Sequence, residues 1–266
     1  MNGMSVGILV VGNEILDGLV LDTNTNWIQK RLTSMGIITR RVVTVRDDIT
    51  EIVSGLAFIL EVCNVAITSG GLGPTHDDLT LAGVAKFCGV NLVEHPVAAE
   101  IVKRQYRILY ERGLVDTPDY IDSRRKMAML PGGATPIDNS VGGAPGIVLK
   151  REQKTIICLP GVPAELKAMF DAHVTGLLAT GEGYFETVVR LGASDETVLA
   201  PAIHDVMTQY PGVYIKSMPR PYGTSDTIRV WVSARCDTTE RSRSLVQEAI
   251  SALARRTGAL VESDDA

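Results

Sequence analysis

The sequence predicts an α/β protein with a mostly parallel sheet, followed by a small α+β domain. In the first 90 residues, short apolar runs alternate with helical patterns. This order is typical of parallel strands joined by right-handed crossovers. Near residue 180 the order changes to strand, helix, strand, strand, helix. We therefore expect a first domain over residues 1–180 and a small βαββα domain over residues 181–266.

The elements of the first half follow from their periodicity and end signals. Apolar or β-branched runs predict strands over residues 6–11, 37–45 and 65–68. Helical spacing predicts helices over residues 24–35, 48–60 and 77–88, the second introduced by a capping-box pattern. Each strand is therefore followed by a helix.

The second half is less regular. Helices are predicted over residues 98–113, with a solvated basic face, and over residues 119–127. The Gly- and Pro-rich stretch 130–150 predicts loops. Residues 155–159 predict a buried strand, and a helix is predicted to begin at Pro163. In the small domain we expect strands over 185–191, 213–218 and 227–234, with helices over 196–209 and 239–256.

Composition excludes several classes of protein. The 266 residues carry 26 basic and 31 acidic side chains, and 5% are aromatic, so we expect neither a disordered chain nor a nucleic-acid partner. The four cysteines and four histidines lack the spacing of a zinc site. Signal-peptide and membrane-span patterns are absent, so we expect a cytoplasmic protein without a membrane partner.

The segment TSGGLGPTHDDLT, residues 68–80, predicts an anion-binding loop. Gly70, Gly71 and Gly73 follow a predicted strand and precede a predicted helix. Ligands of open α/β sheets bind beyond the carboxyl ends of the strands, where backbone N–H groups suit a phosphate. An alternative stays open, because Thr75 and Asp78 have capping-box spacing and the glycines could serve only a tight turn.

Carboxylates follow three predicted strands at one edge of the sheet. Glu14 follows the first strand, Asp47 the second and Asp78 the third. Clustered acids beside a phosphate predict a divalent metal that polarises phosphoryl oxygens or activates water. The alternatives are that Asp48 only caps a helix and that Glu14 is a solvated loop residue.

Four strings together resemble one known family: GNEILxGxxxDTNxxW from Gly12, SGGLGPTHDDLT from Ser69, PGGATPIDNSVGGAPG from Pro131 and LPGVPAELKAM from Leu159. They resemble the amino-terminal domain of CinA-type, competence/damage-inducible proteins. That domain is a member of the molybdopterin-binding superfamily of MoaB/MogA and MoeA. The resemblance implies a three-layer α/β sandwich with a mostly parallel sheet.

The resemblance also implies a set of site residues. Asp47 and Asp78 are the expected catalytic and metal-binding acids, for Mg²⁺ or Co²⁺. The expected ligand- and phosphate-binding residues are Gly12, Glu14, Ser69, Gly70, Gly71, Gly73, Thr75, Asn139, Gly161 and Glu165. For Glu165 an alternative stays open, a first-turn acid that complements a helix dipole.

The leading functional hypothesis is a metal-dependent nucleotide pyrophosphatase that hydrolyses an ADP-ribose- or FAD-like dinucleotide. The alternatives are a non-catalytic protein that binds molybdopterin or another pterin phosphate, and a molybdopterin adenylyltransferase. CinA-type proteins also carry a carboxy-terminal domain that deamidates nicotinamide mononucleotide. We do not expect that activity in a chain ending at residue 266. Superfamily relatives assemble, so we expect a homo-oligomer.

Overall fold

The computed structural model describes residues 4–179, 181–192, 195–218, 227–258 and 261–263. The chain forms two compact units. The first comprises Met1–Thr33 and Ile37–Ala179, and the second comprises Ser34–Gly36 and Thr180–Ala266. No helix in these described ranges is long and apolar enough to cross a membrane.

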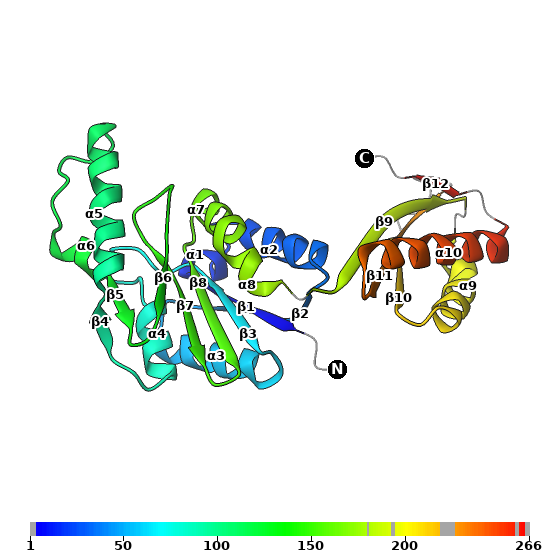
Figure 1. The fold of residues 1–266 in the computed structure, drawn as a ribbon, viewed down its shortest axis with the longest axis horizontal. Coiled ribbons are helices and arrows are strands. Elements are labelled where there is room, and N and C mark those ends of the chain that lie inside the picture. Colours follow the sequence, from blue (N-terminus) through cyan, green and yellow to red (C-terminus); the bar gives the residue numbers. More distant parts are fainter. Residues whose placement is uncertain (1–3, 180, 193–194, 219–226, 259–260, 264–266) are drawn as a thin grey trace. The chain divides into compact units, whose positions relative to one another are not determined.

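A six-stranded sheet forms the centre of the first unit (Figure 1). Its strand order is β2 (Ile38–Val45), β1 (Ser5–Val11), β3 (Val65–Ser69), β8 (Lys154–Leu159), β7 (Gly146–Arg151), β6 (Thr135–Ile137). The first four strands pair in parallel, whereas β7 pairs antiparallel with β8 and β6 antiparallel with β7. The predicted mostly parallel sheet is confirmed.

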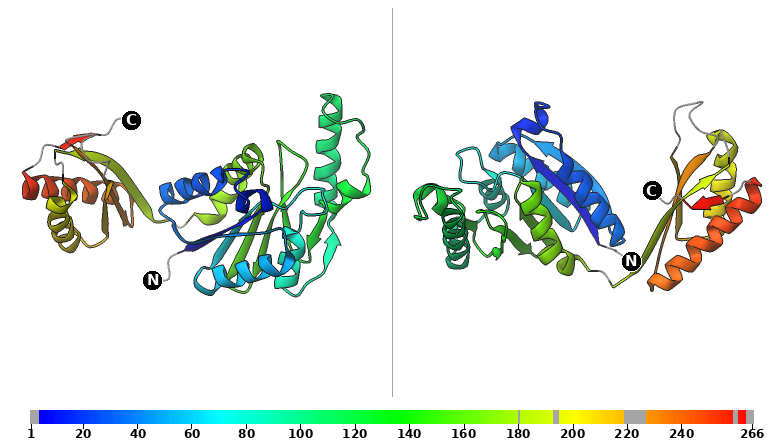
Figure 2. Two further views of the ribbon diagram at one scale, coloured as in Figure 1. Left: turned by 180° about the vertical axis from the view of Figure 1, so that it is seen from behind. Right: turned by 90° about the horizontal axis from the view of Figure 1, so that it is seen from above.

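Helices cover both faces of this sheet, which confirms the three-layer sandwich (Figures 1 and 2). One face carries α3 (Ile49–Val62) and α4 (Thr80–Phe87). The other carries α2 (Thr23–Ser34), α7 (Pro163–Met169), a π-helical segment (Phe170–Val174) and α8 (Thr175–Leu178). The short α1 (Asn13–Leu16) follows β1 directly.

The helices on both faces of the sheet explain why its central strands are apolar runs in the sequence. All five residues of β3 are buried, as are the last six of β1, because each strand lies between two helical layers. Ile52, Leu56 and Ile59 of α3 recur at helical spacing and are fully buried. Burying each such side chain contributes about 1.5–3 kcal/mol to stability.

Asp48 caps the start of α3. Its side chain accepts hydrogen bonds from the backbone N–H groups of residues 50 and 51, so the predicted alternative, in which Asp48 caps a helix, is confirmed.

Beyond β6, a small subassembly departs from the prediction. It contains α5 (Pro96–Glu111), α6 (Asp122–Lys126) and the strand pair β4 (Leu92–Glu94) and β5 (Met129–Pro131). The helix predicted over residues 119–127 is thus confined to α6. The stretch 130–150, predicted to be loops, contains β6 and β7. These strands form because β6 pairs with β7, and β7 pairs with β8 in a hairpin where Arg151 lies opposite Lys154. This pairing is not revealed by the Gly- and Pro-rich composition.

The second unit has the predicted βαββα order with one added strand. Its elements are β9 (Gly183–Leu191), α9 (Glu196–Gln209), β10 (Val213–Met218), β11 (Ile228–Cys236), α10 (Thr239–Thr257) and β12 (Val261–Ser263). The antiparallel order is β10-β11-β9-β12, with a core in which Val206 and Leu253 are fully buried. Its edge strands are suited to pairing, but the homo-oligomer stays a prediction.

The close approach of β1 to α3 gives a test of the packing. A Cβ atom on Gly7 would lie 2.3 Å from Cγ2 of Ile59, whereas one on Gly176 in α8 would meet nothing within 4 Å. Gly7→Ala should lower the free energy of unfolding by about 1–3 kcal/mol through overpacking. Gly176→Ala should raise it by up to about 1 kcal/mol through helix propensity. Urea unfolding checks both, and equal stability of the two variants would contradict the packing described.

Candidate functional site

A cavity of about 450 Å³ lies where the carboxyl ends of the parallel strands meet. It is lined by the residues that follow these strands: Gly12 and Glu14 after β1, Asp47 after β2, residues 70–75 after β3 and residues 160–162 after β8. Side chains from α5 and α7 complete the wall. We call this cavity the crevice.

The crevice brings together ten of the twelve predicted site residues. These are Gly12, Glu14, Asp47, Gly70, Gly71, Gly73, Thr75, Asp78, Gly161 and Glu165. The other two lie behind the wall. Ser69 is buried and accepts a hydrogen bond from Nδ2 of Asn24 (3.1 Å), while Asn139 is fully buried. The roles of all twelve in binding or catalysis stay predictions.

The glycine loop is held close to the end of β1. Gly70 has a φ of 103°, and a Cβ atom there would lie 2.2 Å from the carbonyl oxygen of Val11, so only glycine fits. The Thr80 hydroxyl donates to the Gly70 carbonyl (2.8 Å), and the Thr80 N–H donates to the Gly71 carbonyl (3.1 Å). These two bonds join the loop to the start of α4.

Three successive backbone donors of this loop have no protein acceptor. Within the described ranges, the N–H groups of Gly71, Leu72 and Gly73 make no hydrogen bond to the protein. Consecutive free N–H groups in a glycine-rich turn form a concave anion-binding site. The loop therefore has three backbone donors that are not used by the protein.

Asp78 closes the turn that follows the loop. Its Oδ2 accepts from the backbone N–H of Thr75 (2.8 Å) and from the Thr75 hydroxyl (2.6 Å). The bond from the Thr75 N–H to the Asp78 carboxylate is one of the two hydrogen bonds of a capping box. No helix begins here, however, because α4 starts at Thr80 and has no side-chain cap. The helix start predicted at Asp77 is therefore wrong. Lys126 approaches the same turn and donates to the Thr75 carbonyl.

Negative charge is concentrated beside the loop. Burial raises the pKa of Asp47 above its usual value, and the carboxylates of Glu14, Asp77 and Asp78 raise it further. The Asn13 N–H, which donates to Oδ2 of Asp47 (2.8 Å), acts in the opposite direction. The acids that follow the first three strands therefore lie close together, as the sequence predicts.

The far wall contains a second polar arrangement. Asn139 donates through Nδ2 to Oε2 of Glu165 (2.7 Å) and to the Ala144 carbonyl (2.8 Å). Burial raises the pKa of Glu165, while the bond from Asn139 lowers it. Asn139 thus acts on the crevice through Glu165.

Sequence reasoning missed two side chains of the wall. Tyr106 on α5 and Met127 after α6 both line the crevice. For α5 the charge pattern predicts only a solvated face. The buried stripe of this helix, which includes Ala99, Val102 and Gln105, is the signal that could have placed it against the sheet as the opposite wall.

Comparisons with known proteins agree with this geometry. Residues 7–180 match the model of a family described as "probable molybdopterin binding domain". A protein of Aeropyrum pernix is 42% identical over 250 residues, 92% of this chain and 90% of that protein. One of Pyrobaculum aerophilum is 39% identical over 248 residues, 91% and 90% of the two chains. Alignments of this length include most of the second unit.

A solved structure supports the same assignment. The crystal structure of CinA from Thermoplasma acidophilum, a protein with unknown function, is 38% identical with a TM-score of 0.58. The match covers 65% of this chain and 99% of that chain. The resemblance expected from the four motifs is confirmed.

The charge around Asp47 has a testable effect on stability. A carboxyl whose pKa is higher in the folded state binds its proton more tightly there, so stability falls as pH rises from the unfolded pKa to the folded pKa. Asp47→Asn keeps the acceptor for Asn13 and removes the charge. Without added metal, its melting temperature at neutral pH should equal or exceed that of the wild type, and the difference should vanish near about pH 4.

Asp48→Ala provides the contrast from the adjacent residue. Asp48 caps α3 and does not line the crevice, so its loss should lower stability by about 1 kcal/mol. Thermal melts followed by circular dichroism at several pH values check both variants. A marked loss of stability in Asp47→Asn at neutral pH would contradict the electrostatics described.

Proposed function

This chain belongs to the family of molybdopterin-binding domains, and on this premise we propose that its crevice binds a pterin phosphate such as molybdopterin. The observation that carries the proposal is the row of three free N–H groups at residues 71–73 on the wall of the crevice. A volume of about 450 Å³ falls in the range typical of small-molecule sites. The phosphate would accept hydrogen bonds from the loop, and the ring would occupy the remaining cavity.

The acids beside the loop shape how a phosphate binds. Asp47, Asp77 and Asp78 all line the crevice and would repel an anion in the absence of a cation. Lys126, which contacts Thr75 at the rim, supplies one positive charge. A phosphate therefore binds either through the N–H groups with the support of Lys126, or together with a divalent cation.

Binding can be measured directly. The wild-type protein should bind a pterin phosphate, detected by a change in pterin fluorescence. Gly73→Ala should weaken binding about tenfold or more, because the new Cβ atom would lie 2.6 Å from Oδ2 of Asp78 and displace the carboxylate that closes the loop. Absence of binding by the wild type, or equal binding by Gly73→Ala, would contradict the proposal.

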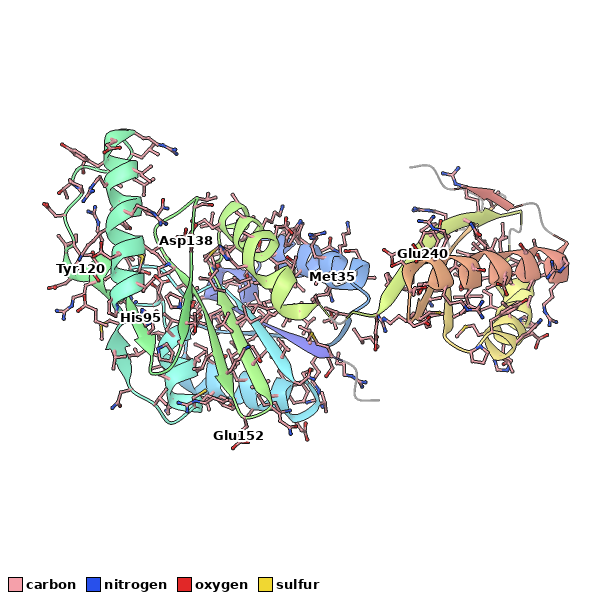
Figure 3. The ribbon with its side chains drawn as sticks, in the orientation of Figure 1. Met35, His95, Tyr120, Asp138, Glu152 and Glu240 are labelled. Carbon is pink, nitrogen blue, oxygen red and sulfur yellow. The ribbon has the colours of Figure 1, made fainter. Side chains whose placement is uncertain are left out.

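A matched control lies at the opposite end of the sheet. Glu152 occupies the turn between β7 and β8, away from the crevice (Figure 3). Glu152→Gln removes one negative charge, as the crevice variants of Asp47 and Asp78 do, and should leave the affinity unchanged.

The acid cluster favours a second candidate, metal-dependent hydrolysis of a dinucleotide pyrophosphate bond. Within the described residues, no group of three or more His, Cys, Asp or Glu side chains could hold a metal by itself. Mg²⁺ often needs only one or two carboxylates, with phosphates and waters completing its shell. Asp47 and Asp78 both line the crevice and fit this role, because a cation would offset the repulsion among these acids, which adds to burial in raising the pKa of Asp47. The metal would polarise the phosphoryl oxygens.

Hydrolysis is tested with ADP-ribose and Mg²⁺ or Co²⁺. The second candidate predicts release of AMP, and a loss of about 100-fold or more in Asp47→Asn and in Asp78→Asn. In the absence of metal, the same Asp78→Asn variant should bind a pterin phosphate as tightly as the wild type or more tightly, since one repulsive charge is gone. Absence of AMP release would exclude hydrolysis and leave the binding proposal standing.

A further inference from the structure

Two consecutive glycines allow an aromatic ring and a carboxylate of the crevice wall to pack against adjacent residues of the backbone. A Cβ atom on Gly142 would lie 2.1 Å from the carboxyl carbon of Glu165. A Cβ atom on Gly143 would lie 2.8 Å from Cε2 of the Tyr106 ring. Both side chains therefore pack against adjacent backbone units, and both line the crevice. We call Tyr106 and Glu165 the ring-recognition pair.

The aromatic member of the pair is held by a buried arginine. The guanidinium carbon of Arg124 lies 3.9 Å from the centroid of the Tyr106 ring. Arg124 is only 7% exposed, and its Nη1 donates to the carbonyls of Thr117 (2.7 Å) and Asp119 (2.6 Å). A cation fixed against an aromatic ring holds the ring in place. Tyr106 is therefore a preorganised wall.

The carboxylate member is held equally firmly. Asn139, which is fully buried, accepts from the N–H groups of Val141 (3.0 Å) and Gly142 (2.8 Å) while it donates to Oε2 of Glu165 (2.7 Å). Within the described ranges, Oε1 of Glu165 accepts no hydrogen bond from the protein. Oε1 is thus left for a ligand, and Oε2 keeps a second lone pair, so both oxygens of this fixed carboxylate can accept from a ligand.

This arrangement selects for a particular heterocycle. An ionised carboxylate only accepts hydrogen bonds, so its best partner is a ring edge with two adjacent N–H donors. Pterin and guanine share such an edge, the ring N–H beside the 2-amino group. Adenine instead presents an acceptor nitrogen beside its amino group, which a carboxylate repels. An aromatic side chain stabilises any of these rings by packing.

We infer that Tyr106 and Glu165 recognise the 2-amino-4-oxopyrimidine edge of the ligand, which makes the crevice selective for pterin- or guanine-type phosphates over adenine-type ones. This inference rests on the proposed binding of a pterin phosphate and adds the selectivity of the ring end. The phosphate is bound at residues 71–73, and the ring lies against residues 106 and 165 in the same cavity.

Affinities for neopterin phosphate, GMP and AMP test the inference. The wild type should bind the first two at least about tenfold more tightly than AMP. Glu165→Gln should weaken neopterin phosphate and GMP about tenfold and leave AMP within about twofold, so that the preference disappears. Tyr106→Leu should weaken all three about fivefold or more.

Controls separate selectivity from folding. Thermal melts should show Glu165→Gln and Tyr106→Leu folded, and Glu152→Gln should bind like the wild type. A merely structural role of Glu165 would weaken all three ligands equally and leave their ratio unchanged.

The outcomes separate the inference from the proposed function. If the wild type binds neopterin phosphate and Gly73→Ala does not, but Glu165→Gln keeps the preference over AMP, the ring-recognition pair is wrong and the proposed function stands. Equal affinity of the wild type for all three ligands would likewise overturn the pair and leave the proposed function standing. If the wild type binds none of them, both are overturned.

Discussion

The backbone contact between Gly70 and Val11 is the constraint on which the site depends. With a Cβ position only 2.2 Å from the Val11 carbonyl oxygen and a φ of 103°, residue 70 must be glycine. This contact lets the loop after β3 turn directly over the end of β1. Gly161 follows β8 on the other side, where its Cβ position is 3.4 Å from Cα of Gly70. The ends of three parallel strands therefore lie close together, and one crevice is lined by Gly12, residues 70–75 and residues 160–162, which follow them.

The two ends of the crevice carry different side chains. Acids that follow the first three strands lie beside the glycine loop, where burial and then the charges of Glu14, Asp77 and Asp78 raise the pKa of Asp47. The far wall combines one carboxylate, Glu165, with the ring of Tyr106. A planar polar ring suits the far wall, whereas a phosphate at the other end needs the loop N–H groups together with Lys126 or a divalent cation to offset the acids. Molybdopterin-type compounds have these parts, in agreement with the family to which the chain belongs.

The sequence was sufficient for the features that local pattern determines. β1 and β3 are buried on both faces and read as apolar runs, and parallel strands bring Gly12, Asp47 and Gly70 to one edge. It failed where pairing between strands and packing between helices and loops decide the structure. β7 forms because β8 pairs with it, although its surroundings are rich in Gly and Pro. The packing of Tyr106 against Gly143 joins residues far apart in the chain, so no local pattern predicts it.

The central claim is that the N–H groups of residues 71–73 bind the phosphate of a pterin phosphate. Amide chemical shifts in a ¹⁵N-labelled sample report on these groups individually. On titration with neopterin phosphate, the amide signals of Gly71, Leu72 and Gly73 should shift together and saturate, while that of Gly176 in α8 stays fixed. Saturable shifts elsewhere in the chain, with these three signals unmoved, would contradict the account.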